Sequence, residues 1–375
     1  MTPERPLGQD ALPEATEKRT VEPSETRTYD SSALYAALDL GTNSCSMLIA
    51  RPRGSQFCVV DSFSKTVQLG TGLEASGRLS RASMGRTMQA LRVCQKKIKK
   101  QLVKRMRLVA TEACRRARNS RDFIRNVERE TGLKLEIIAP EEEARLAVIS
   151  CAPLVSGRTE QLLVVDIGGG STELVWIDLS DVPPQERARA IMRMHSGFKP
   201  NGSGHPAARV VDWISVPLGV ATLKYQFSDV EDDAARFALM SWFFEEKLAN
   251  FLPYNADNPR DHFQIIGTSG TVTTVAASYL GLKRYDRNKV DGLHMTSDQI
   301  DTVIRDYLTL GPEGRRTDPR IGRDRHTLIM SGAAILQALM RIWPTDRLSV
   351  ADRGLREGLL YEQMSADGVL EDGTY

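Results

Sequence analysis

The feature that most constrains the fold is residues 162–175, which read LLVVDIGGGSTELV. An apolar strand ends at Asp166, passes through three glycines and leaves as a second short strand. Because Gly168, Gly169 and Gly170 carry no side chain that would block an anion, the backbone N–H groups of such a turn can point at a phosphate. The stretch therefore predicts a β-hairpin with an anion-binding turn.

The same pattern occurs earlier, in residues 36–49, AALDLGTNSCSMLI. Here a strand ends at Asp39, Gly41 follows two residues later, and small hydroxyl and amide residues lead into a second strand. From 34 to about 151 the expected order is three strands, then helix, strand, helix, strand and helix, and the order repeats with additions from 162 onward. Two copies of one hairpin predict an α/β chain of two duplicated domains, 34–147 and 148–364.

Length and composition are those of an ordinary globular protein. The chain has 375 residues, enough for two domains with their own cores, and 41% hydrophobic and 26% charged residues. A net charge of +2 gives no reason to expect a nucleic-acid polymer as partner. Five cysteines without a CxxC pair predict a reducing compartment and no thiolate zinc site. Without an apolar run of about 18 residues, and with charges near the N-terminus, we expect a cytoplasmic protein and no membrane partner.

Several segments fall outside the duplicated pattern. Residues 1–33 are rich in Pro, Glu, Thr and Ser and are expected to be disordered, and 365–375 is expected to be a C-terminal tail. Residues 180–209 are expected to form a long polar loop, of the kind that is either functional or mobile. Residues 296–310 and 325–342 are expected to form extra helices with an apolar face that belongs to the core.

A long amphipathic helix is predicted from Ser80, a plausible N-cap, to about Lys104. Its polar face is strongly basic. The basic residues are Arg92, Lys96, Lys97, Lys99, Lys100, Lys104 and Arg105. Such a face can bind a polyanion, but most charged helix faces are simply solvated, which is the interpretation we favour from the sequence.

Three turns are candidate phosphate sites. Asp39 and Asp166 can each hold a divalent cation while the following glycine turn approaches phosphate oxygens. A single D-x-G is common in plain turns, but two at matching places in duplicated halves would face each other across an interdomain cleft. The third turn follows the strand that ends near Ile266 and opens a helix. It consists of Gly267, Thr268, Ser269, Gly270 and Thr271, and either an anion site or a simple Ser/Thr cap explains it.

Acidic and basic candidates lie between the first two turns. Glu141, Glu142 and Glu143 follow Pro140 in the first turn of a predicted helix, where they complement the helix dipole. One of them, ionised at neutral pH, could instead accept a proton from water as phosphorus is attacked. Arg115 could supply the positive charge that phosphoryl transfer needs, or it could be a surface arginine.

At these residues the sequence resembles the exopolyphosphatase and guanosine pentaphosphate phosphohydrolase family, the Ppx/GppA phosphatases. The resemblance implies the RNase H-like fold of the superfamily of actin, sugar kinases and Hsp70 ATPase domains, with an interdomain active-site cleft. The matching segments are collinear from about 34 to 360. They are ALDLGTNS (37–44), LGTGL (69–73), ATEACRRARN (110–119), EEEARL (141–146), VVDIGGGSTELV (164–175), SVPLGV (215–220), GTSGTVTTVA (267–276), YDRNKVDG (285–292) and VADRGLREGLL (350–360).

The resemblance implies a Mg²⁺-dependent cytoplasmic hydrolase that removes the terminal phosphate of inorganic polyphosphate, of guanosine pentaphosphate or of both, and so takes part in the stringent response. Glu143 matches the catalytic base, Glu173 a second catalytic carboxylate and Arg115 a phosphate-binding arginine. Asp166 and Asp39 match the metal-binding positions. The matching phosphate-binding residues are Asp39, Gly41, Thr42, Asn43, Ser44, Gly168, Gly169, Gly170, Ser171, Gly267, Thr268, Ser269, Gly270 and Thr271. Because no HD-type domain follows Leu360, the chain resembles the short, two-domain form, for which a homodimer remains open.

The sequence departs from the family pattern at three places. Ser46 stands where an Arg or His is usual, Gln68 and Thr71 replace an arginine and an acid, and Ala139-Pro140 replaces Ser-Gly before the base. These departures keep open a second hypothesis, a sensor that binds polyphosphate or an alarmone without hydrolysing it. A third is an ATP-dependent kinase or ATPase of the same superfamily.

Overall fold

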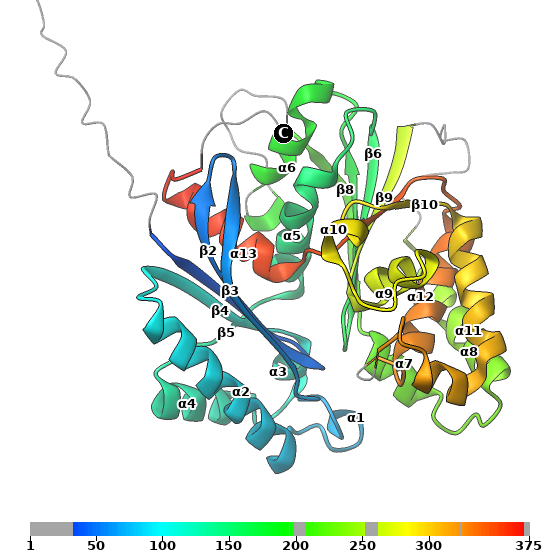
Figure 1. The fold of residues 1–375 in the computed structure, drawn as a ribbon, viewed down its shortest axis with the longest axis horizontal. Helices are drawn as coiled ribbons and strands as arrows, with labels where there is room; N and C mark the ends of the chain where they lie inside the picture. Colours follow the sequence, from blue (N-terminus) through cyan, green and yellow to red (C-terminus); the bar gives the residue numbers. More distant parts are fainter. Residues whose placement is uncertain (1–32, 195, 199–206, 252–261, 323–324, 371–375) are drawn as a thin grey trace, which may run out of the picture.

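The computed structural model describes residues 33–194, 196–198, 207–251, 262–322 and 325–370. These residues form a mixed α/β fold with two β-sheets, one in each half of the chain (Figure 1). This confirms the predicted α/β class and the two-sheet arrangement that the duplicated hairpins imply. The predicted tail 1–33 lies outside the described residues except for Ala33.

The first sheet has five strands in the order β3-β2-β1-β4-β5. The strands are β1 (Tyr35–Leu40), β2 (Ser44–Arg53), β3 (Gln56–Thr66), β4 (Arg105–Ala110) and β5 (Glu136–Ile137). The first three are antiparallel and β4 and β5 run parallel to β1. Alternate side chains of β1 point to opposite faces, as in any strand, so Leu38 and Leu40 join one core and Tyr35 and Ala37 another.

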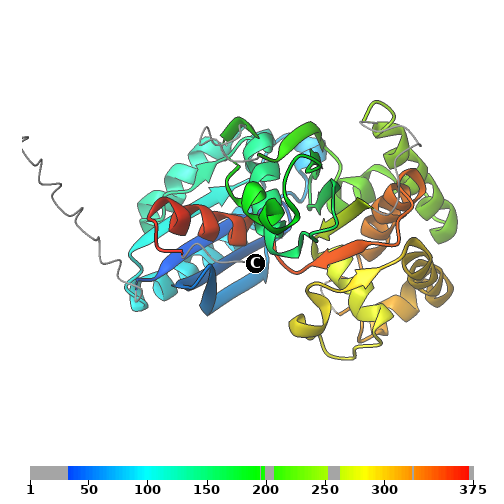
Figure 2. The same cartoon turned by 90° about the horizontal axis from the view of Figure 1, so that it is seen from above.

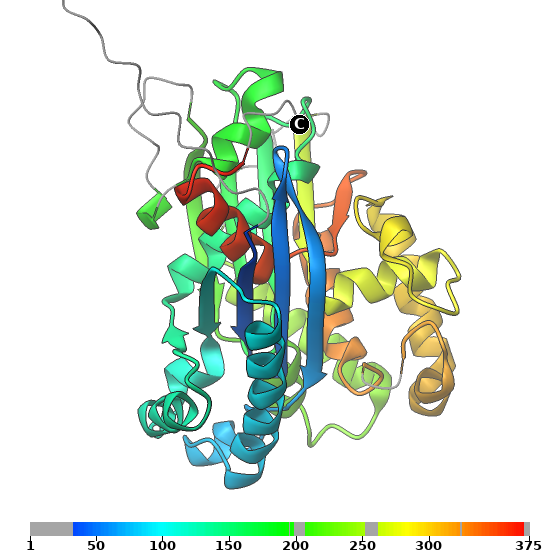
Figure 3. The ribbon, with the colours of Figure 1, turned by 60° about the vertical axis from the view of Figure 1, so that its left-hand side comes forward.

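One face of the first sheet is covered by helices from the same half. They are α1 (Leu73–Ser76), α2 (Arg81–Lys100), α3 (Glu112–Arg116) and α4 (Ser120–Thr131). Ser80 caps α2 by accepting a hydrogen bond from the N–H of Ser83, which confirms the predicted start. Met88, Leu91 and Phe123 pack from these helices onto β1 and β2. Figure 3 shows α2 and α4 together at the end of the molecule away from α13.

The second sheet has six strands in the order β10-β11-β9-β6-β7-β8. The strands are β6 (Gln161–Ile167), β7 (Thr172–Asp178), β8 (Arg209–Val216), β9 (Phe263–Thr268), β10 (His294–Met295) and β11 (Leu348–Ala351). Five longer helices cover one face: α7 (Val220–Gln226), α8 (Asp233–Lys247), α9 (Gly270–Tyr279), α11 (Ser297–Thr317) and α12 (Ile329–Ile342). The short α10 (Arg287–Val290) lies beside them. The same three antiparallel strands followed by a parallel one recur, which is the predicted duplication.

Two helices lie between the sheets. α5 (Pro140–Cys151) packs on the second sheet through Ala144 and Val148. α13 (Leu355–Ala366) follows the last strand of the second sheet but packs on the first, where Leu359 and Met364 join the core of Tyr35; Figure 2 shows this helix over the first strands. A side chain at Gly358 would come within 2.1 Å of the Leu146 carbonyl oxygen, so α13 crosses α5 with backbones in close contact. The predicted boundary between 147 and 148 stays a prediction.

The expectation of a polar loop at 180–209 is wrong for most of the segment that the structure describes. It contains a 3₁₀ turn (Pro184–Glu186), the helix α6 (Arg187–Met192) and the start of β8 at Arg209. Val182, Ala190 and Ile191 are buried against the second sheet. The polar run PPQERARA gave no sign of this helix. A short helix has few apolar residues on its buried side, and here charged residues stand between them.

The predicted extra helices are present, with different limits. α11 continues to Thr317, beyond the predicted end, although Gly311 at φ 63° precedes Pro312 and interrupts the helical backbone. α12 begins at Ile329 and not at Arg325. No helix in the described part of the chain is long and apolar enough to cross a membrane. All five cysteines are free, and four of them are buried.

Candidate active site

The two predicted hairpin turns lie against each other. In the first, the N–H of Gly41 donates to the Ser44 carbonyl over 2.9 Å, and in the second Gly168 donates to Ser171 over 2.9 Å. A Cβ on Gly169 would lie 3.2 Å from the Asn43 backbone nitrogen. Such close approach of two turns tolerates only glycine. The turns from the two sheets thus meet as the sequence predicted.

A cavity of about 700 Å³ opens beside these turns. It lies between the two sheets and is lined by residues from both turns, from the β9–α9 turn and from the start of α13. Most of the predicted site residues line it. They are Asp39, Gly41, Thr42, Asn43, Ser44, Glu143, Asp166, Gly168, Gly169, Gly170, Ser171, Thr268, Ser269, Gly270 and Thr271.

Three predicted site residues do not line the cavity directly. Gly267 lies inside β9, where a Cβ would touch the Val272 side chain at 3.2 Å, so its role here is to let α9 pack close. Glu173 is 2% exposed in β7, opposite Asp166 in the ladder. Arg115 lies one layer behind the cavity wall, bonded to Glu143 over 2.7 Å.

Four carboxyl groups from different elements surround the cavity. Glu143 of α5 and Glu173 of β7 are buried, and Asp39 of β1 and Asp166 of β6 are partly buried. Burial, and then the charge of Glu143, raises the pKa of Asp39 to about 7. Burial, with the charges of Glu143 and Asp39, raises the pKa of Asp166 to about 8. Burial also raises the pKa of Glu173, and nearby Glu143 adds to it. The carboxylates repel one another because few positive charges lie among them, and this repulsion adds to the rise in their pKa values.

Two oxygens of this group have no hydrogen-bond partner. Asp39 Oδ1 and Glu173 Oε2 are buried and unsatisfied, while Ser215 donates to the other oxygen of Glu173 over 2.8 Å. Buried acceptors without a donor are costly unless a cation or ligand binds them. Hard carboxylate oxygens are what Mg²⁺ prefers, and Mg²⁺ is often held by one or two carboxylates plus substrate phosphate. Asp39 and Asp166 line the same cavity, and two carboxylates with room for a phosphate are a donor set that fits such a shared site. Among the described residues, no group of three or more His, Cys, Asp or Glu could hold a metal by itself.

Two glutamates in the first turn of α5 point in different directions. Glu143 points to the cavity and is 8% exposed. Burial raises its pKa, against the opposing charge and hydrogen bond of Arg115. Arg115 also donates to the Ile138 carbonyl oxygen over 3.0 Å and to Glu112. The predicted phosphate-binding arginine is thus, in this structure, the ion-pair partner of Glu143, and its charge opposes the rise in the pKa of that carboxyl.

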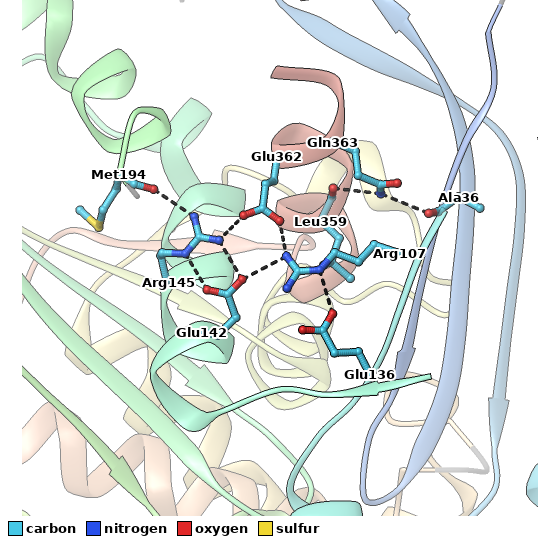
Figure 4. Close-up of polar contacts among 9 residues, drawn as sticks. All are labelled: Ala36, Arg107, Glu136, Glu142, Arg145, Met194, Leu359, Glu362 and Gln363. Carbon is cyan, nitrogen blue, oxygen red and sulfur yellow. Dashed lines mark hydrogen bonds and ion pairs between the residues drawn. The ribbon is translucent and has the colours of Figure 1, made fainter. Parts of the chain in front are cut away.

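Glu142 points the other way, into an ion-pair cluster shown in Figure 4. Arg145 donates to both of its oxygens over 2.8 Å, and Arg107 donates over 3.0 Å. Although burial opposes it, these bonds hold the pKa of Glu142 below its usual value. Both arginines also bind Glu362 of α13, and Arg145 donates to the Met194 carbonyl over 3.0 Å. The cluster fixes α5, and with it the direction of Glu143.

The third turn is a capped helix start that also lines the cavity. The Ser269 hydroxyl accepts from the N–H groups of Thr271 and Val272 over 3.1 Å each. The simple cap left open by the sequence is therefore present. Arg325 binds the same turn, donating to the Gly270 carbonyl over 3.0 Å and to Thr274 over 2.5 Å.

Four cationic side chains at the cavity were not predicted as site residues. They are Lys65, Arg325, Arg353 and Arg356. The charge of Arg356 opposes the rise in the pKa of Asp39, so it lies close to that carboxyl, whereas Arg353 is paired with Asp291 over 2.9 Å. Arg353 and Arg356 occur in the segment VADRGLREGLL, and that motif was the available signal. Nothing in the local sequence of Lys65 or Arg325 marks them.

The departures from the family pattern have visible structural consequences. Ser46 lines the cavity and shares a hydrogen bond of 2.9 Å with Ser64, so it brings no charge. Lys65, beside Ser64 in the neighbouring strand, supplies a cation near the same wall. Gln68 lines a separate, smaller pocket. Pro140 occupies the first position of a regular helix, with Glu143 N–H bonded to the Ala139 carbonyl over 3.1 Å, so the proline does not displace the base.

Comparisons with known proteins agree with this geometry. The model of the Ppx/GppA phosphatase family matches residues 48–367. A guanosine-5'-triphosphate,3'-diphosphate pyrophosphatase of Aeromonas hydrophila is 29% identical over 330 residues, which cover 88% of this chain. The same alignment covers 59% of that protein, so the chain spans about three fifths of the length of the curated relatives it matches.

Solved structures show the same fold. The Aquifex aeolicus member of the Ppx/GppA family is 29% identical, with a TM-score of 0.70, over 89% of this chain and 98% of that one. An exopolyphosphatase from Cytophaga hutchinsonii, at 20% identity, shares the fold with a TM-score of 0.73 over 89% of this chain and 98% of its own. The facing glycine turns, the buried carboxylates and the match over most of the chain lead to one conclusion: the chain belongs to the Ppx/GppA phosphatase family.

Proposed function

We propose that the chain hydrolyses the terminal phosphoanhydride bond of inorganic polyphosphate, of guanosine pentaphosphate or of both. The observation that carries this proposal is the set of four buried or partly buried carboxyl groups around two glycine turns in contact with each other. A ligand that brings phosphates and cations would satisfy the orphaned oxygens and neutralise the group. The names of the Aeromonas relatives and of the Cytophaga structure support the two substrate classes.

In this proposal the terminal phosphate lies between the turns that begin at Gly41 and Gly168, whose N–H groups serve as donors to its oxygens. Glu143 accepts a proton from the attacking water as the new P–O bond forms. The P–O bond of the anhydride breaks, and the shortened chain leaves with the electron pair. Asp39 and Asp166 would hold Mg²⁺, which would neutralise phosphate charge and orient the terminal group.

Arg115 and Glu173 have supporting tasks. Arg115, bonded to both Glu143 and Glu112, opposes the rise in the pKa of the base and so favours its ionised form. Glu173, held by Ser215, places a second negative charge near the water and the cation. Free, mostly buried thiols are compatible with the reducing cytoplasm that we propose as the location.

The test is phosphate release by the purified protein from long-chain polyphosphate, guanosine pentaphosphate and ATP, each with Mg²⁺ and with EDTA. We expect Mg²⁺-dependent release from at least one of the first two and none in Glu143→Gln, and the ratio of their rates identifies the substrate. Faster turnover of ATP would replace the proposal with an ATPase. Tight binding without release would replace it with the sensor that Ser46 and Gln68 suggested.

A further inference from the structure

α2 and α4 form an open groove of about 940 Å³, separate from the cavity described above. We call it the arginine groove. Its charged lining residues are Arg78, Arg81, Arg92, Arg125 and Arg129, with Asp122 and Glu130. Five arginines against two carboxylates leave a net charge of +3. A concentration of guanidinium groups of this kind is suited to binding an anion, because each presents several donors to phosphate oxygens.

The positive charges of the groove are available to a ligand. Arg78 and Arg81 form no ion pair within the described residues. Arg92 and Arg125 are paired, with Glu130 and Asp122, but their side chains are 54% and 76% exposed. Such exposed pairs are worth little and exchange readily for another anion.

The remaining lining indicates a ligand without a large apolar part. Met88 and Phe123 form the floor, yet they are only 6% and 3% exposed, so they offer little surface to a base or an acyl chain. Gly85 is the fifth residue of α2, inside the helix, where glycine costs about 1 kcal/mol relative to alanine. A Cβ there would meet nothing within 4 Å, so packing does not require this glycine. Its effect is to leave the wall of the groove open.

Two arginines, at the end of α3 and just after it, lie between the active-site cavity and the groove. A smaller pocket of about 340 Å³ shares Thr42 and Glu112 with the cavity and is also lined by Arg116. The next arginine, Arg118, donates its N–H to the Gly77 carbonyl over 3.0 Å, beside Arg78 of the groove. Arg116 is paired with Glu74 over 2.6 Å, through a side chain that is 34% exposed, so an anionic chain leaving the cavity on this side would compete with Glu74 before it reached Arg118 and Arg78.

The groove is long compared with a single phosphate. Arg81 and Arg92 are eleven residues apart on α2, or about 16 Å along a helix that rises 1.5 Å per residue. Exposed Lys96, Lys99 and Lys100 continue the same helix. One orthophosphate cannot contact both ends of this array, whereas a chain of phosphates can.

We propose that the arginine groove binds the distal part of a long inorganic polyphosphate while its end lies in the cavity. The inference rests on the proposed function and extends it, because it favours long polyphosphate as the substrate class. It assigns the basic helix, which sequence alone left as a solvated face, to substrate binding.

The first test neutralises the two unpaired arginines in Arg78→Gln/Arg81→Gln. The matched control is Arg51→Gln/Arg53→Gln, which removes the same charge from two exposed arginines of the β2–β3 hairpin. We expect the KM for long-chain polyphosphate, and the dissociation constant measured by calorimetry in the Glu143→Gln background, to rise about tenfold in the groove variant only. Kinetic constants on tripolyphosphate should not change. Equal effects in groove and control variants would overturn the proposal.

The second test places a charge in the groove by Gly85→Glu. Glutamate is a better helix former than glycine, so the thermal midpoint should stay the same or rise while the affinity for long polyphosphate falls. Single-stranded DNA is the competitor: if it displaces polyphosphate from the groove at equal charge concentration, the groove is a nucleic-acid site and the proposal is wrong. Binding does not need turnover. If the protein binds polyphosphate through the groove but hydrolyses nothing, the proposed function is refuted and the groove remains a binding site. If hydrolysis of long polyphosphate is unaffected by either groove variant, the groove proposal is refuted and the proposed function remains.

Discussion

Glu142 and Glu143 are neighbours in one helical turn, but the charges around their two carboxyl groups are opposite in sign. Glu142 is bonded to Arg145 and Arg107, and its pKa is lowered. Glu143 faces three other carboxyl groups with one arginine beside it, and its pKa is raised. A carboxylate that stabilises the fold is paired with arginines of the protein itself. A carboxylate that takes part in chemistry has fewer such partners, so that a bound ligand can supply the remaining positive charge.

The strongest test of this difference between Glu142 and Glu143 is to remove the charge of each one separately. We expect Glu143→Gln to lower kcat about 10³-fold, the scale of general base catalysis, with little loss of stability. Glu142→Gln should lower the free energy of unfolding by about 2 kcal/mol because it leaves buried guanidinium groups short of an acceptor, while kcat at low temperature changes little. Phosphate release and urea unfolding of both variants give the answer. If both lose activity equally, the two glutamates do not differ as described.

The second prediction concerns the cation at the centre of the structural cluster. Arg145→Ala should lower the free energy of unfolding by about 3 kcal/mol, because the side chain is only 3% exposed and its loss leaves Glu142 and Glu362 short of their shared cation. Arg125→Ala is the control. Its ion pair is 76% exposed and should be worth less than about 0.5 kcal/mol. Chemical denaturation with matched slopes measures both, and similar losses would show that burial does not matter here.

The third prediction uses pH. Because the folded pKa values of Asp39 and Asp166, about 7 and about 8, lie above the unfolded value of 3.8, the folded state binds more protons than the unfolded state between about pH 4 and 8. The free energy of unfolding of the metal-free protein should therefore fall as pH rises through this window. Thermal midpoints at pH 5.5 and 8.5 test this, and Asp39→Asn should reduce the difference. A midpoint that rises with pH would contradict the assignment.

The smallest expected effect concerns Ser46. Replacing it in Ser46→Arg restores the residue type that the family pattern has there and places a charge on the cavity wall next to Asp39, its partner in the β1–β2 ladder. We expect the KM for short polyphosphates to fall by about two- to fivefold with kcat unchanged, since one partly exposed charge is worth less than about 1 kcal/mol. The matched variant Lys65→Gln should raise the same KM. If neither changes, the two strands do not contribute charge to phosphate binding.

Sequence reasoning predicted the parts of this site that depend on local backbone. The D-x-G hairpins, the Pro140 start of α5 and the Ser80 cap all follow from residue types at fixed spacing. Residue types alone could not choose among Glu141, Glu142 and Glu143, which only the family resemblance did, because the choice depends on which side of α5 faces Arg145 and which faces the cavity. Nor could sequence reasoning find Lys65 or Arg325, which reach the cavity through strand pairing and a distant loop. The helix within 180–209 was missed because its burial depends on contacts far away in the chain.

The crossing of α13 onto the first sheet also affects the order in which the protein can fold during synthesis. Residues 33–137 contain every strand of the first sheet, yet the face that carries Tyr35 and Ala37 is only partly covered, by Ile138 and Leu146, until Leu359 and Met364 of α13 are made. The half of the chain that leaves the ribosome first is thus the last to complete its core, and in the interval it exposes an apolar sheet face of the kind that chaperones bind.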